Sequence, residues 1–245
     1  MSRAIDSVVF APLNWPAVAR LIDHTLLKPD STAAQVGQLC QEAVQYGFPT
    51  VFVSPCYVAL AARILRGTQV KVGTPIGFPQ GVTLSRVKRF EALEALREGA
   101  AELDMVLNVG ALKSDYRALV ESDIRGVVEV GHGAGAIVKV ILETTLLTTE
   151  QKILACELAV VAGADFVKTS TGLVGGATAE DVRLLRSVVG TRARVKASGG
   201  IRTASELLAM VAAGADRIGT SSGTRIVREW GAPELKEAPS TEKNS

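Results

Sequence analysis

The chain has 245 residues and a formal net charge of +2, and 47% of its residues are hydrophobic although only 4% are aromatic. The near balance of charge gives no reason to expect a nucleic-acid partner, and no apolar run approaches the ~18 residues of a typical membrane-spanning helix. We therefore expect a large aliphatic core, in a chain whose length a single α/β barrel often reaches.

Short β-rich runs alternate with amphipathic helical stretches almost to the end of the chain. The predicted strands are Leu21–Leu27, Thr50–Ser54, Val70–Ile76, Glu102–Asn108, Ala136–Leu142, Asp165–Ser170, Arg194–Ser198 and Arg217–Ser221. Between them, apolar residues recur at helical spacing in stretches such as Thr83–Gly99, Thr148–Gly163 and Thr203–Gly214. Helix-capping residues are expected at Ser31-Thr32, Thr148-Thr149, Thr178 and Thr203.

Eight strands that alternate with helices predict a single (β/α)8 TIM barrel, an α/β fold. A doubly wound open sheet is the alternative, but it would need a glycine-rich fingerprint after its first strand, and residues 22–26 contain no glycine. The barrel domain is expected over residues 1–230, with a short N-terminal extension. Residues 231–245 lack apolar periodicity, so we expect them to form a disordered polar tail.

Two lysines lie inside runs that otherwise predict buried strands. Lys168 stands in Val-Lys-Thr-Ser-Thr-Gly, and Lys196 stands in Val-Lys-Ala-Ser-Gly-Gly. Neighbouring strands lie ~4.8 Å apart, so two inward-pointing lysines on the sixth and seventh strands would disfavour each other's charge. One amine would then lose its proton near neutral pH and attack a carbonyl carbon. The alternative is that both point outward or pair with acidic side chains, and spacing alone does not decide.

Acidic side chains inside such a barrel would find lysine partners. Asp104 lies between Leu103 and Met105 in the fourth predicted strand, where a buried carboxylate needs a partner. It is a candidate for proton transfer beside the amine, or else belongs to a structural ion pair. Lys139 is expected to be its electrostatic support, and Asp23 is a candidate for holding a substrate hydroxyl. Lys168, Lys196, Asp104 and Lys139 are expected late in their strands, at the barrel end that carries the chemistry.

Glycine-rich segments follow the last two predicted strands. Gly199 and Gly200 follow the seventh strand. The segment Gly219–Gly223, which contains Ser221 and Ser222, lies at the end of the eighth strand. Glycine lets backbone N–H groups approach an anion, and the loops after strands seven and eight are a frequent phosphate site of these barrels. We expect a phosphate site here, with ordinary turn glycines as the alternative.

The histidines give no sign of a metal centre. His24 and His132 are the only two in the chain, and a zinc enzyme would need several converging ligands. We therefore expect no metal and no cofactor, and we expect His24 to be a hydrogen-bonding residue of the core or the rim.

Six segments together resemble the deoxyribose-phosphate aldolases, a family of class I aldolases, across nearly all of residues 17–228. They occur in the order typical of that family, which makes the resemblance specific. The matching segments are Ile22–Pro29, Val72–Pro79, Glu102–Gly110, Lys139–Thr144, Lys168–Gly172 and Lys196–Thr203.

The resemblance implies a metal-independent lyase. It would reversibly cleave a phosphosugar, 2-deoxy-D-ribose 5-phosphate, to D-glyceraldehyde 3-phosphate and acetaldehyde through a Schiff base. It implies that Lys168 is the Schiff-base lysine, that Lys196 perturbs it, and that Asp104 is an acid/base carboxylate. The residues expected around the substrate and its phosphate are Asp23, Thr171, Gly172, Gly199, Gly200, Ser221 and Ser222.

Three features depart from some members of the family. Phe52 stands where some members have a cysteine, and Leu173 stands where some have a lysine, which would leave fewer charges for the phosphate. Residues 231–245 contain no tyrosine. The proton transfer that a C-terminal tyrosine performs in some members would therefore be left to Lys196, Asp104 and water.

Two other functions stay open at this point. One is a different Schiff-base barrel enzyme, transaldolase-like or dehydroquinase-like, and the other is a phosphosugar-binding barrel without catalytic activity. Three cysteines without a CxxC pair, together with the lack of a signal-peptide pattern, predict a cytoplasmic protein with reduced thiols. Apolar outer faces of the helices would allow a homodimer, but the sequence does not indicate which face.

Overall fold

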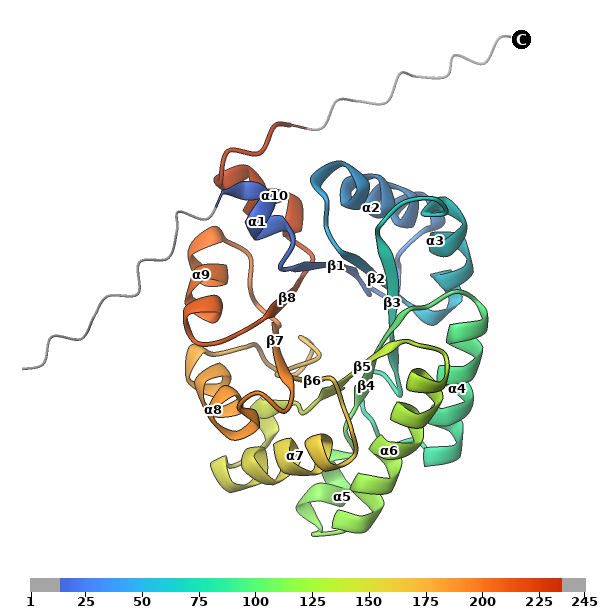
Figure 1. Ribbon diagram of the computed structural model, residues 1–245, viewed down its shortest axis with the longest axis vertical. Coiled ribbons are helices and arrows are strands. Elements are labelled where there is room, and N and C mark those ends of the chain that lie inside the picture. Colours follow the sequence, from blue (N-terminus) through green and yellow to red (C-terminus); the bar gives the residue numbers. More distant parts are fainter. Residues whose placement is uncertain (1–13, 235–245) are drawn as a thin grey trace, which may run out of the picture.

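The eight β-rich runs become the strands of a closed parallel barrel in the computed structural model, which describes residues 14–234 (Figure 1). The strands pair in chain order, and the last pairs with the first. Each observed strand lies within its predicted run, so the predicted TIM barrel is confirmed. The strands are β1 (Ile22–Leu26), β2 (Thr50–Val53), β3 (Lys71–Ile76), β4 (Glu102–Val106), β5 (Ile137–Ile141), β6 (Phe166–Lys168), β7 (Arg194–Ser198) and β8 (Arg217–Thr220).

Helices surround the barrel on its outside (Figure 1). Within residues 14–234, none of them has the length and apolar character needed to cross a membrane. The helices are α1 (Trp15–Ala19), α2 (Ala33–Tyr46), α3 (Val58–Ile64), α4 (Ser85–Arg97), α5 (Val109–Lys113), α6 (Arg117–Gly133), α7 (Thr149–Val161), α8 (Ala179–Val189), α9 (Ala204–Ala212) and α10 (Gly223–Glu229), with 3₁₀ turns η1 (Pro55–Tyr57) and η2 (Thr144–Leu146).

Four helices begin where the sequence predicts a capping residue. In each case a threonine side chain accepts a hydrogen bond from the backbone N–H three residues further on, and such a cap typically adds about 1 kcal/mol to stability. The N-caps of α2, α7, α8 and α9 are Thr32, Thr148, Thr178 and Thr203.

Two predicted segments lie at the ends of the chain. The predicted N-terminal extension includes residues 1–13, and most of the predicted tail falls in residues 235–245; both stretches lie outside the described residues. The division into a barrel domain over residues 1–230 and a polar tail over residues 231–245 stays a prediction.

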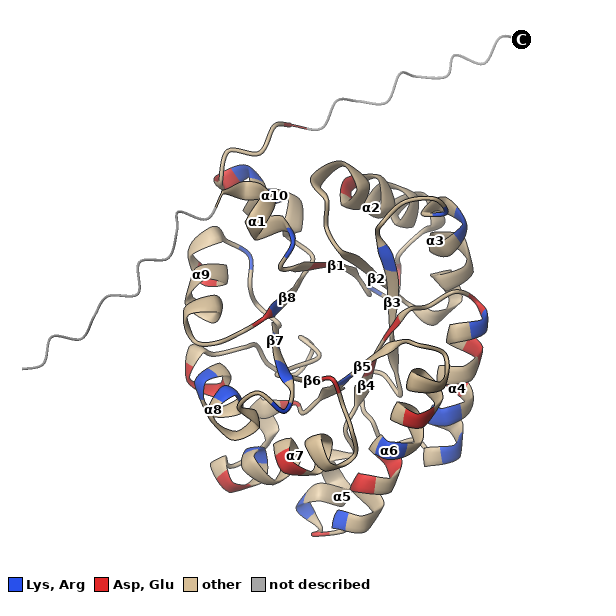
Figure 2. Ribbon diagram, viewed as in Figure 1, with Lys and Arg blue, Asp and Glu red and all other residues tan. Residues whose placement is uncertain are grey.

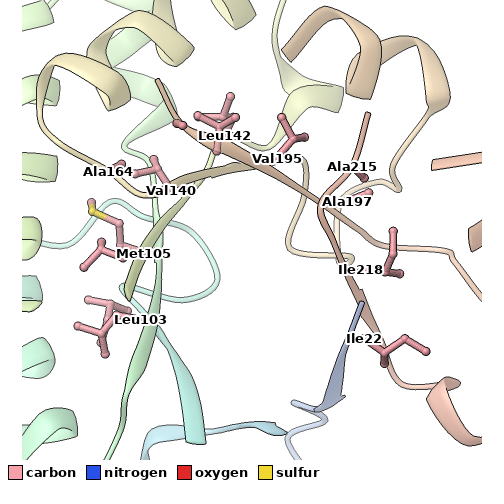
Figure 3. Close-up of a cluster of buried hydrophobic side chains, with 14 of the residues drawn as sticks. Ile22, Leu103, Met105, Val140, Leu142, Ala164, Val195, Ala197, Ala215 and Ile218 are labelled. Carbon is pink, nitrogen blue, oxygen red and sulfur yellow. The ribbon is translucent and has the colours of Figure 1, made fainter. Parts of the chain in front are cut away.

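In β4, apolar side chains point to the outside of the barrel and acidic side chains to the inside. In β4, Leu103 and Met105 are buried among the hydrophobic core residues, and Figure 3 shows them on the outer side of the strand. Glu102 and Asp104, the alternate residues, bond to lysines of other strands. Because side chains alternate between the two faces of a strand, the aliphatic core forms between barrel and helices, and the interior is free to hold charge.

Close packing of α6 on β5 gives a first prediction. A Cβ atom added at Gly131 would lie 2.4 Å from Cγ2 of Val138, whereas one added at Gly133 meets nothing within 4 Å. Gly131→Ala is expected to lower the free energy of unfolding by about 1–3 kcal/mol through overpacking. The control Gly133→Ala, in the same helix, should leave it unchanged or raise it by up to about 1 kcal/mol. Urea unfolding measures both, and equal destabilisation by the two variants would contradict the packing.

Candidate active site

Charged side chains of both signs meet inside the barrel. Figure 2 marks the positions of acidic and basic residues on the strands as well as on the outer helices. The charged side chains inside the barrel comprise three carboxylates and four basic groups, so one positive charge lacks a counterpart if every group is ionised. They are Asp23 on β1, Glu102 and Asp104 on β4, Lys139 on β5, Lys168 on β6, Lys196 on β7 and Arg217 on β8.

Asp104 lies at the centre of this network and contacts three lysines. Its Oδ1 accepts a hydrogen bond from Nζ of Lys139 at 3.0 Å, and its Oδ2 accepts from Lys168 at 2.9 Å and Lys196 at 2.7 Å. Burial alone would raise the pKa of Asp104, but the three ammonium groups outweigh burial and hold it well below its usual range. At neutral pH Asp104 is therefore an ionised acceptor.

Lys168 differs from the other two lysines in its position and in its pKa. It is the last residue of β6 and 6% exposed, while Lys139 and Lys196 are 0% and 1% exposed. Burial lowers the pKa of Lys168 to about 8; Asp104 opposes this shift, and the positive charges of Lys196 and Lys139 add to it. A substantial fraction of Lys168 is thus an unprotonated amine at mildly alkaline pH, and an unprotonated amine can attack a carbonyl carbon.

Lys139 is the most firmly held of the three amines. It bonds to both carboxylates of β4, Glu102 and Asp104, and has no exposed surface. Burial pulls the pKa of Lys139 down, but these two carboxylates and Asp23 outweigh burial and raise it. A permanently charged Lys139 fits the electrostatic support expected from the sequence.

Asp23 pairs with basic groups of the last two strands. Its Oδ2 lies 2.5 Å from Nζ of Lys196, and its Oδ1 accepts from Nε of Arg217 at 2.8 Å. Burial would raise the pKa of Asp23, but Lys196, Lys139 and Arg217 together lower it. Because both oxygens of Asp23 already face cations, its expected contact with a substrate hydroxyl stays a prediction.

The ring of Phe52 forms an aromatic platform for the ammonium groups. Nζ of Lys196 lies 3.8 Å from the ring centroid, that of Lys139 4.6 Å and that of Lys168 5.9 Å. A cation this close to an aromatic face is stabilised by the ring quadrupole. Gly73 makes room for the ring, because a Cβ atom there would lie 2.4 Å from Cζ of Phe52.

The predicted phosphate residues lie around the rim of the barrel. Gly172, Gly199 and Gly200 all have positive φ, at 87°, 94° and 79°, a conformation that L side chains rarely adopt. The loops after β6 and β7 touch, since a Cβ atom at Gly199 would lie 2.9 Å from the carbonyl oxygen of Gly175. Ser221 is exposed and Ser222 half-buried at the end of β8. Phosphate binding by these residues stays a prediction.

The structure brings Lys168, Lys196, Asp104 and Lys139 together, as the sequence suggested. It corrects one expectation: only Lys168 stands at the end of its strand, and the other three occupy the middle of theirs. All three are more deeply buried than Lys168, and each of them contacts a group of opposite charge in the barrel interior.

Sequence reasoning assigned no role in the network to Glu102, Arg217 or Phe52. Glu102 stands two residues before Asp104, so strand periodicity placed both on one face, and this signal was available. Arg217 and Phe52 carried no such local signal.

His24 is buried on the outer side of β1. Its Nε2 lies 2.6 Å from Oε2 of Glu42 on α2, so it is a hydrogen-bonded core residue, as expected. In the part of the chain that the structure describes, no group of three or more His, Cys, Asp or Glu side chains is arranged to hold a metal ion.

A parallel barrel that buries a lysine of lowered pKa among further cations has the arrangement of enzymes that use lysine as a covalent nucleophile towards carbonyl compounds. Comparison with known proteins is consistent with this class. The sequence pattern of the DeoC/LacD family of aldolases matches residues 17–229. The chain belongs to this aldolase family, whose members are carbon–carbon lyases.

Named relatives are similar over nearly their whole length. A deoxyribose-phosphate aldolase of Geobacillus sp. (strain WCH70) is 59% identical over 211 residues, which cover 86% of this chain and 94% of that protein. One from Thermococcus kodakarensis is 56% identical over 225 residues, covering 91% and 100%. The solved structure of the Aeropyrum pernix deoxyribose phosphate aldolase, described as a unique tetramer, has a TM-score of 0.84 and 37% identity, covering 89% and 92%.

The charge network gives a prediction for pH dependence. The amine of Lys168 must be unprotonated to react, so its adduct formation with a short aldehyde should rise with pH, with a midpoint near the pKa of about 8. Lys196→Met removes a positive neighbour that lowers this pKa, so the midpoint should move to higher pH. Cyanoborohydride trapping followed by peptide mass spectrometry measures the profile.

The control for this experiment is Lys152→Met. Lys152 pairs with Asp181 on the outer helices, and its removal should leave the midpoint unchanged. A midpoint that stays fixed in Lys196→Met, or moves to lower pH, would contradict the assigned role of Lys196.

Proposed function

We propose that this protein reversibly cleaves 2-deoxy-D-ribose 5-phosphate to D-glyceraldehyde 3-phosphate and acetaldehyde, with Lys168 as the Schiff-base lysine. The observation that carries the proposal is the setting of this amine. It is the least buried of three neighbouring lysines, it stands at the end of its strand, and its pKa is lowered to about 8. The names of the similar aldolases supply the substrate.

The reaction follows from the chemistry of an amine and an aldehyde. Lys168 adds to C1 of the open-chain sugar, and loss of water gives an iminium ion. Removal of the proton from the C3 hydroxyl breaks the C2–C3 bond, because the iminium accepts the electron pair and becomes an enamine. The three-carbon fragment leaves as the aldehyde that carries the phosphate. Protonation of the enamine at C2, followed by hydrolysis of the restored iminium, releases acetaldehyde and regenerates Lys168.

The proton transfers fall to Lys196, Asp104 and water. The resemblance implies an acid/base carboxylate at Asp104, and a carboxyl whose pKa lies well below its usual range is ionised at neutral pH, which is the form that accepts a proton or orients a water molecule. Its Oδ2 receives hydrogen bonds from both Lys168 and Lys196. When Lys168 forms the iminium it loses N–H donors, and Asp104 is then free to hold a water molecule instead.

The loops at the rim would hold the phosphate. Gly172, Gly199 and Gly200 keep the backbone open to a ligand through their positive φ, and Ser221 and Ser222 add hydroxyl donors at the end of β8. Leu173 supplies no charge, so this site would depend on backbone N–H groups and hydroxyls.

Two other functions are less well supported. A Schiff-base barrel with another substrate would share Lys168, but the family membership favours the deoxyribose-phosphate reaction. A phosphosugar-binding barrel without activity would have no need for an amine whose pKa is lowered by burial.

Reductive trapping tests the nucleophile. With 2-deoxyribose 5-phosphate present, borohydride should leave a stable adduct on the peptide that carries Lys168, as seen by mass spectrometry. Lys168→Ala should lose the adduct and essentially all turnover while keeping the circular dichroism spectrum of the folded barrel. Lys196→Ala serves as the matched control, because it should lower turnover but keep Lys168 available for labelling. An adduct on Lys196 alone would overturn the assignment.

We also infer that the enzyme works in the cytoplasm as a dimer of identical chains. Cys40, Cys56 and Cys156 are all unpaired thiols, in agreement with a reducing compartment. A tetrameric relative makes self-association plausible for this chain. The face we propose for it is α4, where Phe90 is 63% exposed and a surface hollow of about 640 Å³ lies alongside the helix.

The charges of α4 support a second copy of the same helix as the partner. Arg86 and Arg89 stand in its first half, and Glu94 and Glu98 stand at its end, where Arg97 pairs with Glu94. The basic residues in the first half oppose the helix dipole, which favours acidic residues first and basic residues last. An antiparallel copy related by two-fold symmetry would place the basic half of each helix over the acidic half of the other.

Phe90→Glu tests this face, because it puts a charge at the centre of the proposed contact. The variant should be monomeric by light scattering, while wild-type protein and the control Leu119→Glu, which alters an exposed apolar residue of α6, should share a higher mass. A monomeric wild type, or a Phe90→Glu variant of unchanged mass, would refute the proposed dimer.

A further inference from the structure

Glu143 combines an unfavourable backbone conformation with a buried carboxylate. It follows β5 at the end of the barrel where Lys168 stands, and its φ and ψ are 57° and 60°. This left-handed region is unfavourable for residues other than glycine and concentrates at functional sites. The residue is also only 3% exposed, although it carries a carboxylate.

The pairing of β5 with β6 explains how Glu143 comes to be there. The backbone N–H of Leu142 donates to the carbonyl of Lys168 at 2.9 Å, and that of Thr144 donates to the carbonyl of Thr169 at 3.0 Å. Between these two hydrogen bonds, the chain advances by two residues after β5 but by only one residue after β6. Glu143 is therefore an extra residue in the ladder, as in a β-bulge, and bulges beside active sites re-aim a side chain.

The re-aimed side chain holds the loop that follows Lys168. Oε2 of Glu143 accepts hydrogen bonds from the hydroxyl of Thr171 at 2.5 Å and from its backbone N–H at 3.2 Å. The hydroxyl oxygen of Thr171 in turn accepts from the N–H of Leu173 at 3.2 Å.

Glu143 makes these bonds without any cation to neutralise it. Among residues 14–234 no basic side chain lies within ion-pair distance of Glu143, and its Oε1 is buried without a hydrogen-bond partner. A buried carboxylate left in this state opposes folding. Stability of the barrel therefore does not account for Glu143, and its contact with Thr171 does.

We propose that Glu143 is a positioning residue that fixes Thr171 as a hydrogen-bond acceptor for a hydroxyl group of the sugar. A threonine hydroxyl has one proton and two lone pairs. The hydroxyl proton of Thr171 is donated to Glu143, and one of the two lone pairs accepts the N–H of Leu173. One lone pair of the hydroxyl oxygen therefore remains to accept a hydrogen bond from another donor. This inference rests on the proposed function, because it assumes that the substrate reaches Lys168 with its hydroxyl groups beside Thr171.

Glu143→Gly separates this role from a structural one. Glycine relieves the left-handed backbone, so the variant should melt at the same temperature as wild type or higher. Loss of the hydrogen bond that Thr171 accepts from the sugar should nevertheless raise KM for 2-deoxyribose 5-phosphate about two- to tenfold. Adduct formation between Lys168 and acetaldehyde, which has no hydroxyl group to position, should keep its wild-type rate.

Two further variants sharpen the test. Glu143→Gln keeps an oxygen that can accept from Thr171 and should restore most of the affinity. Asp115→Gly is the matched control, since Asp115 has the same φ of 57° on the exposed surface away from the site. It should keep both KM and the melting temperature, or raise the latter.

A double-mutant cycle asks whether Glu143 acts through Thr171. Thr171→Ala should raise KM by about as much as Glu143→Gly, and the double variant should be no worse than either single one. Additive effects, or a lower melting temperature of Glu143→Gly at unchanged KM, would overturn the inference while leaving the proposed function intact. If wild-type enzyme does not cleave the phosphosugar, both fall together.

Discussion

The unequal number of charges inside the barrel is the constraint on which the rest of the structure depends. Three carboxylates face four basic groups, and every carboxylate of this network contacts at least one of them. A buried excess charge is unfavourable, and a lysine can remove it by releasing a proton, which an arginine cannot do. Lys168 is the least buried of the three lysines, and burial together with the charges of Lys196 and Lys139 lowers its pKa, so the excess is relieved there, and the amine that results is a nucleophile.

This network exists only in the closed barrel. Asp104 on β4 reaches Lys196 on β7, and Asp23 on β1 reaches Lys196 and Arg217. These partners are far apart in the chain and meet only after the strands between them have paired and β8 has closed on β1. Packing of the aliphatic layer between strands and helices stabilises the closed barrel. The closed barrel in turn keeps the charged side chains of the interior close together.

Local sequence predicted the fold and part of the site. Strand runs, threonine caps and the lysines of β6 and β7 are all features of neighbouring residues, whereas spacing alone did not decide whether Lys168 and Lys196 point inward. Arg217 and Phe52 could not be found in this way, because their roles depend on which strands meet across the barrel. The assignment of Lys168, and not Lys196, as the candidate nucleophile likewise came from the family resemblance. The smaller burial of Lys168 gives that assignment a physical basis.

Phe52 and Gly73 pack against each other across two neighbouring strands. The ring occupies the space where any side chain at position 73 would project, and its face lies beside the ammonium groups of Lys139 and Lys196. A chain that replaces the ring with a smaller residue loses this platform but gains a cavity that a side chain at position 73 can fill. A larger residue at position 73 would therefore need a smaller residue at position 52.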